Sequence, residues 1–262
     1  FSAIGSIASS GMLYLSQLIT GWFGDTASGV YGAASQLVTP MAMITGALTS
    51  VLYPALAAAH GAGDKEKLRS HTDLTTRGFV ALLVPIFGAL AIASRPLIHL
   101  IYELGRGKEG YMEAAVLMPV FCIALLLNNV ATPSVSAVTS GAHRNVRYSM
   151  LLSQAGLLTA VLVWVTTVPF LGLFAIVLGY GAGVTLTALS LMGVAWRQTG
   201  QRWNGLAFFV LGSAILIGAV SWLVQSLSPS YWIDLVAAVI FGIVWLGLSV
   251  RSIRRVVSAL RS

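Results

Sequence analysis

Long apolar segments alternate with short polar connectors along the chain. A bilayer core about 30 Å thick needs roughly 20 apolar residues in a helix, and each segment is close to or above that length. The runs are continuous and lack the ten-residue alternation of membrane barrels, which argues against strands. The pattern predicts an all-α polytopic membrane protein with eight transmembrane helices, at residues 4–22, 28–58, 76–102, 113–141, 147–168, 172–196, 205–227 and 232–250.

Basic residues fall mostly in alternate connectors, which orients the expected helices. If all eight segments span, only Arg95, Arg106 and Lys108 lie on the minority side. Cytoplasmic loops carry an excess of lysine and arginine. We therefore expect the majority side, and with it both ends of this chain, to be cytoplasmic. The majority group comprises Lys65, Lys67, Arg69, Arg77, Arg144, Arg147, Arg197, Arg202, Arg251, Arg254, Arg255 and Arg261.

Composition supports a membrane protein and excludes several other classes. Charged residues make up 9% of the 262 residues and hydrophobic residues 57%, too few charges to cover a soluble surface. The net charge of +7 is divided among short clusters rather than along one face, so nucleic acid is not an expected partner. Cys122 is the sole cysteine and lies in an apolar run, where we expect a small buried hydrophobe and no disulfide.

Internal prolines are concentrated in the second, third and fourth expected helices. These three helices are also unusually long, so they must bend, tilt or protrude. Bent helices around a central water-filled space are typical of transporters, while ordinary packing kinks are the alternative. Gly179 and Gly183 have the spacing that lets two helices approach closely. The prolines are Pro40, Pro54, Pro85, Pro96, Pro119 and Pro133.

The polar residues at membrane depth are almost all neutral. No carboxylate falls at the centre of an expected helix, no histidines have metal-ligand spacing and no phosphate-binding loop is present, so we expect no enzyme, metal or cofactor. Neutral side chains in hydrocarbon need a polar partner, which is either another helix or a hydrophilic substrate. Arg95 lies near the outer headgroups, where it either snorkels or contacts an anionic substrate. The substrate-path candidates are Tyr14, Gln17, Tyr31, Gln36, Arg95, Asn128 and Asn129.

Three stretches resemble a known transporter family. Gly29-Val-Tyr-Gly-Ala-Ala-Ser-Gln-Leu-Val-Thr-Pro40, followed by Val51-Leu-Tyr-Pro54, is similar to the second lobe of polysaccharide flippases. These belong to the multidrug, oligosaccharidyl-lipid and polysaccharide exporter superfamily, whose members have a Tyr-x-x-Ala-x-x-Leu-x-x-Pro segment. The run from Arg95 to Tyr102 resembles the end of the family's third lobe helix, and Ala137 to Arg144 the end of the next. The resemblance covers about residues 1–200.

The resemblance implies a two-lobe flippase of the bacterial cytoplasmic membrane. Residues 1–200 would form a six-helix lobe and residues 201–262 an appended helix pair with a basic tail, while an N-terminal lobe would precede this chain. The implied partners are membrane lipids and a polyprenyl-diphosphate-linked saccharide, moved by alternating access. Lipid II flippases carry a basic residue where this chain has Gln36, so a lipid-linked oligosaccharide or teichoic-type precursor fits better than lipid II.

Two other functions remain open at this point. One is a drug or metabolite antiporter of the same fold, with its coupling carboxylate in the preceding lobe. The other is a membrane scaffold for a polysaccharide-synthesis complex that transports nothing itself. The appended pair is apolar and free of internal proline, so we expect it outside the lobe, with Trp222 and Trp245 away from the central cavity and a polyprenyl tail along its side.

Overall fold

The computed structural model of the chain is helical throughout the residues that it describes. These are residues 2–105, 110–140, 143–201, 204–227 and 230–260. Arg106, Lys108, Arg202 and Arg261, which the charge sorting used, lie outside them. Side chains are not described for residues 2–10, 42, 48, 51–52, 143–144, 146, 204 and 251–260.

Ten α-helices and two short irregular helices make up the described chain. No strand occurs among the described residues. The elements are α1 (Ser2–Thr20), η1 (Gly21–Phe23), α2 (Asp25–Val38), α3 (Met41–Gly61), α4 (Lys65–Ile92), α5 (Ser94–Ile98), the π-helix η2 (His99–Leu104), α6 (Glu113–Thr139), α7 (His143–Leu171), α8 (Leu173–Thr199), α9 (Asn204–Leu227) and α10 (Tyr231–Leu260).

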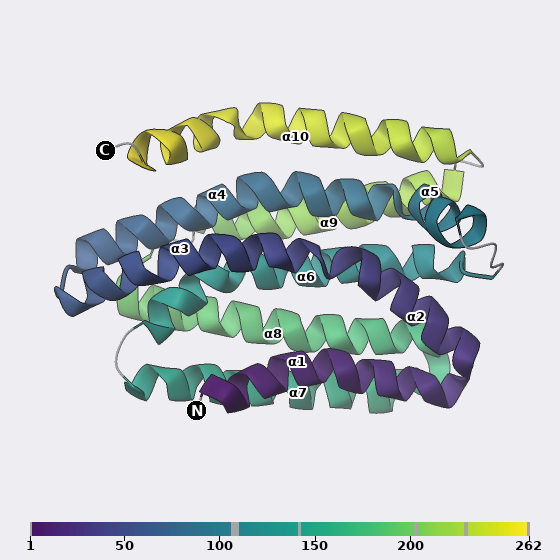
Figure 1. The fold of residues 1–262 in the computed structure, drawn as a ribbon, viewed down its shortest axis with the longest axis horizontal. Coiled ribbons are helices and arrows are strands. Elements are labelled where there is room, and N and C mark those ends of the chain that lie inside the picture. Colours follow the sequence, from purple (N-terminus) through teal and green to yellow (C-terminus); the bar gives the residue numbers. More distant parts are fainter. Residues whose placement is uncertain (1, 106–109, 141–142, 202–203, 228–229, 261–262) are drawn as a thin grey trace.

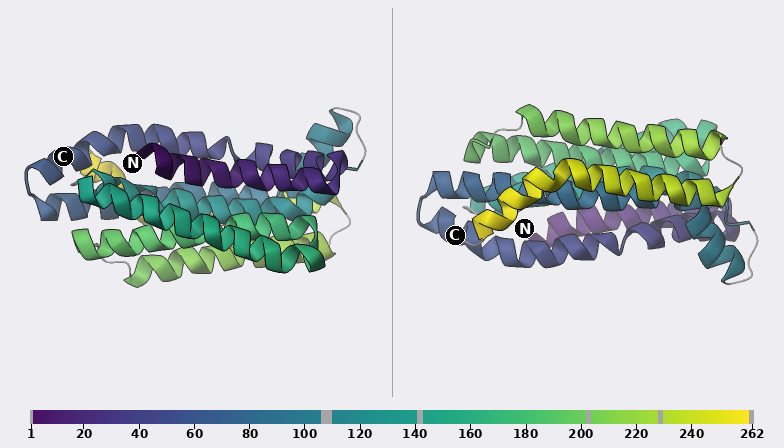
Figure 2. Two further views of the ribbon diagram at one scale, coloured as in Figure 1. Left: turned by 90° about the horizontal axis from the view of Figure 1, so that it is seen from below. Right: turned by 90° about the horizontal axis from the view of Figure 1, so that it is seen from above.

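The long helices lie side by side along one common axis (Figures 1 and 2). Helix α10 forms one edge and packs on α4, while α1 and α7 form the opposite edge. Between the two edges, α6 contacts α2, α3, α4, α8 and α9. Helix α6 is therefore the centre of the bundle, and α7, α9 and α10 are mostly exposed on its outside.

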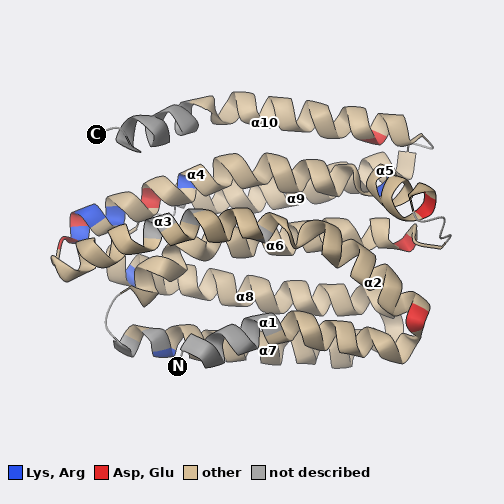
Figure 3. Cartoon of the chain, viewed as in Figure 1, with Lys and Arg blue, Asp and Glu red and all other residues tan. Residues whose placement is uncertain are grey.

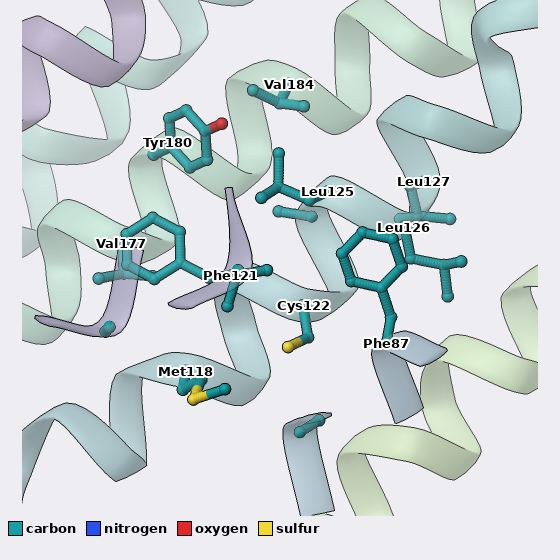
Figure 4. Packing of buried hydrophobic residues seen from close by; sticks show 14 of the residues in the cluster. Phe87, Met118, Phe121, Cys122, Leu125, Leu126, Leu127, Val177, Tyr180 and Val184 are labelled. Atoms are coloured by element: carbon teal, nitrogen blue, oxygen red, sulfur yellow. The ribbon is translucent and has the colours of Figure 1, made fainter. Parts of the chain in front are cut away.

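The core surrounds the central helix α6 (Figure 4). Phe121 of α6 packs edge-on against Tyr31 of α2, with ring centroids 5.1 Å apart, and also contacts the ring of Tyr180 in α8. Cys122 is fully buried beside these rings, which confirms its prediction as a small core residue. Aromatic rings from three helices thus fix the position of α6.

Helices α7 and α8 approach so closely that only glycine fits between them. A Cβ atom at Gly183 would lie 2.5 Å from the backbone oxygen of Gly156, and one at Gly179 would overlap the ring of Trp164. The Trp164 indole instead donates to the carbonyl oxygen of Ile176, at 2.9 Å. The close approach expected from Gly179 and Gly183 is confirmed.

Six helices in the described residues are long and apolar enough to cross a membrane. They are α4, α6, α8 and α9 and the apolar parts of α7 and α10. The all-α membrane fold is therefore confirmed, but the count of eight spans is not. The second expected span is divided at Thr39 and Pro40 into α2 and α3, because proline cannot donate to the preceding turn.

Three boundaries differ from those expected. Helix α4 begins at Lys65 rather than at residue 76, so the first basic cluster is helical and not a connector. The Asp64 carboxylate caps this helix by accepting from the backbone N–H of Lys67 at 2.9 Å. The third expected span ends early, because the helix breaks at Ala93 before α5 and η2. Helix α10 continues through the basic tail to Leu260.

The described basic side chains, except Arg95, gather at the end of the bundle where α3 turns into α4, which we call the basic end (Figure 3). Asp64, Glu66 and Asp73 lie at this end as well. Asp25, Glu103, Glu113 and Asp234 lie at the opposite end. The basic residues thus gather at one end of the folded chain, whereas the acidic residues are divided between both ends.

Candidate functional site: a polar groove between α3 and α6

Helices α3 and α6 border an open groove of about 580 Å³, which we call the α3–α6 groove. The α3 residues recur at intervals of three or four, so they share one face of that helix. Four of the six α3 residues carry a hydroxyl, and none carries a charge. The lining residues are Thr45, Gly46, Thr49, Ser50, Tyr53 and Pro54 of α3, with Asn129 and Thr132 of α6.

Prolines in both walls leave backbone acceptors at the groove. Pro54 has no N–H for the carbonyl of Ser50, and Pro133 has none for the carbonyl of Asn129. Both carbonyls belong to residues that line the groove. At membrane depth such acceptors are tolerated only beside protein or water. The kinked helices therefore add hydrogen-bonding capacity to this site.

The groove also contains a hydroxyl group without a partner. Thr45 is 2% exposed, and its Oγ1 makes no hydrogen bond. By contrast, the Thr49 hydroxyl donates to the carbonyl of Thr45 at 2.7 Å, and Asn129 Nδ2 donates to the carbonyl of Leu125 at 2.7 Å. A buried hydroxyl without a partner costs roughly 1–3 kcal/mol. Thr45 is thus positioned to bind a polar group that enters the groove.

Toward the basic end, contacts between α3 and its neighbours close the groove. The Tyr53 hydroxyl donates to the backbone oxygen of Thr139 at 3.4 Å. Further on, Leu56 and Ala59 of α3 pack against Leu68 of α4 and Ala137 of α6. In this conformation the polar surface is therefore sealed off from the basic end.

The uncharged residues that the sequence predicted to line the substrate path do not all lie in the groove. Asn129 lines the groove, and Asn128 is exposed one turn before Thr132, whose hydroxyl lies 3.4 Å from the Asn128 carbonyl. Tyr14 and Gln17 are exposed on α1, and Gln36 is exposed on α2; none of them lines the groove. The structure thus concentrates the site on α3 and α6.

Comparison with protein families decides the kind of protein. The family model described as lipid II flippase MurJ matches residues 2–242. The chain belongs to the lipid II flippase MurJ family. No individual curated protein gives a match. The chain therefore belongs to a family of membrane flippases for lipid-linked precursors and not to a family of enzymes.

Tyr31 holds helices together in this MurJ-family chain. It is fully buried, and its hydroxyl is hydrogen-bonded to the Ser16 hydroxyl of α1. Its ring meets Phe121 of α6. These contacts join α1, α2 and α6 and leave no exposed surface for a substrate in this conformation.

Arg95 forms an ion pair and further hydrogen bonds within the protein. Its Nε and Nη2 donate to the Asp234 carboxylate at 2.8 and 2.6 Å, and its Nη1 and Nη2 donate to the carbonyls of Gln225 and Val224. Asp234 is fully buried. This ion pair binds the α9–α10 pair to α5, and contact of Arg95 with an anionic substrate stays a prediction.

The α3 hydroxyls are not among the residues predicted from the sequence, although a signal for them exists. Thr45, Thr49 and Tyr53 repeat every four residues within a mostly apolar helix. That interval indicates one polar stripe. Serine and threonine hydroxyls in apolar helices commonly bond to their own backbone, so they indicate a site less strongly than amides do.

Membership of the MurJ family also bears on the expected substrate. The preference for an oligosaccharide or teichoic precursor over lipid II rested on Gln36 alone. The family match is to the lipid II flippases, so it gives that preference no support. It supports flipping of a lipid-linked precursor and leaves the identity of the saccharide to experiment.

Proposed function

We propose that this chain is the second lobe of a MurJ-type flippase, and that the saccharide of a polyprenyl-diphosphate-linked precursor passes along the α3–α6 groove. The observation that carries this proposal is the buried, unpartnered Thr45 hydroxyl in a groove of neutral polar groups. The match to the MurJ family supplies the class of substrate. An N-terminal lobe would cover the exposed faces of α1, α2 and α3 and complete the path.

The chemistry of the groove suits a sugar. Sugar hydroxyls need donors and acceptors where water is scarce, and the groove offers both without fixed charge. Neutral partners hold a ligand weakly enough to release it on the far side. The break between α2 and α3 at Pro40 supplies a hinge for rocking between the two access states.

The diphosphate would be bound elsewhere. Gln36 is uncharged, and Arg95 is already paired with Asp234. We therefore assign diphosphate binding to the N-terminal lobe. The antiporter alternative gains nothing from the groove, because none of its lining residues is a carboxylate. Lipid II is the first substrate to test, since it is the substrate in the family's name.

Transport by the complete protein in liposomes tests this proposal. Replacing Thr49 and Thr132 together with valine removes one hydroxyl from each wall of the groove. Flipping of fluorescent lipid II should be strongly reduced, while folding stays intact. Thr166→Val is the matched control, because Thr166 is exposed on α7, bonds the carbonyl of Leu162 in its own helix and does not line the groove. Unchanged transport in the double variant would show that these hydroxyls are not on the path.

The choice of saccharide is tested in the same liposomes. Lipid II, a polyprenyl-diphosphate-linked oligosaccharide and a teichoic-type precursor are offered separately. Flipping of lipid II at the highest rate would assign the family's named substrate to this chain. Flipping of only one of the other two would restore the preference drawn from Gln36. Failure of all three would favour the scaffold function.

Orientation is tested by thiol labelling in intact cells. Cysteine at Lys67 should be shielded from an impermeant reagent, and cysteine at Glu113 should react. The two positions lie at opposite ends of the bundle. The native Cys122 is buried and should give little background. Labelling of Lys67→Cys from outside would overturn the cytoplasmic assignment of the basic end.

A further inference from the structure

A second cleft, separate from the α3–α6 groove, opens between α4, α9 and α10. It has a volume of about 360 Å³ and shares no lining residue with the groove. Helix α4 lies between α10 and α3, so the cleft opens on the side of the bundle that carries the α9–α10 pair (Figures 1 and 2). Its lining includes Arg77 and Val80 of α4, Leu206 and Phe209 of α9, and Leu248 and Ser249 of α10.

The cleft contains a buried donor that the protein does not use. Ser249 is 3% exposed, and its hydroxyl makes no hydrogen bond. One turn earlier, the indole N–H of Trp245 is also buried without a partner, and its ring packs 4.9 Å from that of Phe209. Unpartnered buried donors are disfavoured. An oxygen-rich group in the cleft would satisfy the Ser249 hydroxyl.

A cation stands at the mouth of the same cleft. The side chain of Arg77 is exposed, and within the described residues it forms no ion pair. Asp73, one turn earlier, has an interaction of its own. Lys65, Lys67 and Arg69 on the same helix are offset by Asp64, Glu66 and Asp73, so Arg77 itself supplies the positive charge at the cleft. An anion is therefore attracted to this position, while Leu206, Phe209 and Leu248 offer apolar walls.

At the end of the α9–α10 pair opposite the basic end, an ion pair joins the helices, and the cleft has no such pair. There, Arg95 and Asp234 form a direct ion pair between α5 and α10. Near the basic end, Arg77 of α4 forms no ion pair within the described part of the chain, and a cleft opens between α4, α9 and α10. A ligand that supplies an anion and apolar chains would complete the contact.

We propose that this cleft binds one anionic glycerophospholipid of the cytoplasmic leaflet. Arg77 pairs with the lipid phosphate, the Ser249 hydroxyl donates to a phosphate or ester oxygen, and the acyl chains lie along Phe209 and Leu248. The lipid then joins α10 to α4 at the basic end. The leaflet assignment rests on the orientation given under Proposed function; the binding site itself does not depend on transport.

Lipid binding to the purified complete protein tests the proposal. Phosphatidylglycerol retained by the protein is counted by native mass spectrometry, with phosphatidylcholine as the neutral comparison. Arg77→Gln should weaken phosphatidylglycerol binding by about tenfold or more, as loss of one charge-assisted hydrogen bond would. Ser249→Ala should weaken it by a smaller factor. Arg77→Lys should retain most of the binding and shows that the fold tolerates a change here.

Matched controls decide between this site and its alternatives. Arg69→Gln removes the same charge from the same helix outside the cleft, and it should change binding little. An equal loss in Arg69→Gln would reduce the effect to diffuse attraction and overturn the proposal. Equal retention of phosphatidylcholine would also overturn it. Displacement by inorganic phosphate alone would indicate a free-phosphate site, and displacement by polyprenyl diphosphate would assign the cleft to the substrate.

The outcome can be separated from that of the proposed function. Lipid counting needs no transport, so a failed flipping assay with intact lipid binding contradicts only the flippase path. Conversely, if the wild-type protein flips its substrate normally but retains no phosphatidylglycerol, only the proposal for the cleft is contradicted. The thiol-labelling result independently fixes the leaflet from which the lipid comes.

Discussion

Two polar regions of this molecule differ in how their hydrogen bonds are satisfied. The Arg95 cluster, made of Ser94, Arg95, Gln225 and Asp234, is closed on itself: Arg95 pairs with Asp234, and Gln225 donates to the Ser94 hydroxyl at 2.8 Å. The α3–α6 groove is open, and its Thr45 hydroxyl has no partner. Both regions lie in a largely apolar chain. Polar groups that pair with one another hold helices together, whereas unpaired groups in an open groove are available to a substrate.

The largest loss of thermal stability is expected when one partner of the Arg95–Asp234 ion pair is removed. Asp234→Leu leaves the Arg95 guanidinium in a partly buried position without its carboxylate. Loss of one partner of a buried pair costs about 3–5 kcal/mol. We expect a large fall in the thermal midpoint of the detergent-solubilised protein, measured by the fluorescence of its tryptophans.

The double replacement sharpens this test. Arg95→Met with Asp234→Leu removes both charges, so the cost should be much smaller than that of Asp234→Leu alone. An equal loss of stability in the single and double variants would mean that the cluster matters through its shape. Charge pairing would then not explain how the Arg95 cluster differs from the α3–α6 groove.

An intermediate loss of stability is expected when a side chain is added where α10 packs closely on α4. A Cβ atom at Gly88 would overlap the ring of Phe241, whereas one at Gly242 would meet nothing within 4 Å. Gly88→Leu should therefore cost about 1–3 kcal/mol by overpacking, and Gly242→Leu should cost nothing. Thermal midpoints of the two variants measure the difference. Equal behaviour would show that α10 does not pack on α4 as described.

The sequence predicted the features that depend on local pattern. Hydropathy located the long helices, the basic connectors indicated the basic end, and the spacing of Gly179 and Gly183 indicated a close helix contact. Each of these signals lies within one turn or one segment. They are readable because a helix in lipid must satisfy its own backbone.

Features that depend on distant partners could not be predicted in the same way. Arg95 and Asp234 are 139 residues apart, and nothing in either segment indicates the other. The split at Pro40 and the early start of α4 depend on packing and capping, so hydropathy windows missed them. The groove required knowing which face of α3 meets α6. The sequence placed Asn129 within a long apolar helix but could not say which hydroxyls accompany it.

The most direct test of the central claim compares two buried threonines. Thr45 in the groove has no hydrogen-bond partner, whereas Thr76 of α4 is bonded to the carbonyl of Thr72 and to the amide of Gln201. Both are almost fully buried, and valine is nearly the same shape in each case. Thermal midpoint and lipid II flipping are measured for both variants in the complete protein.

The account predicts opposite outcomes for the two substitutions. Thr45→Val should leave the thermal midpoint unchanged or slightly raised, because it removes an unsatisfied group, and should strongly reduce flipping. Thr76→Val should lower stability by about 1 kcal/mol and leave flipping by the folded protein near normal. Loss of stability in Thr45→Val with normal flipping would contradict the account, because the groove would then be a packing feature and not a substrate path.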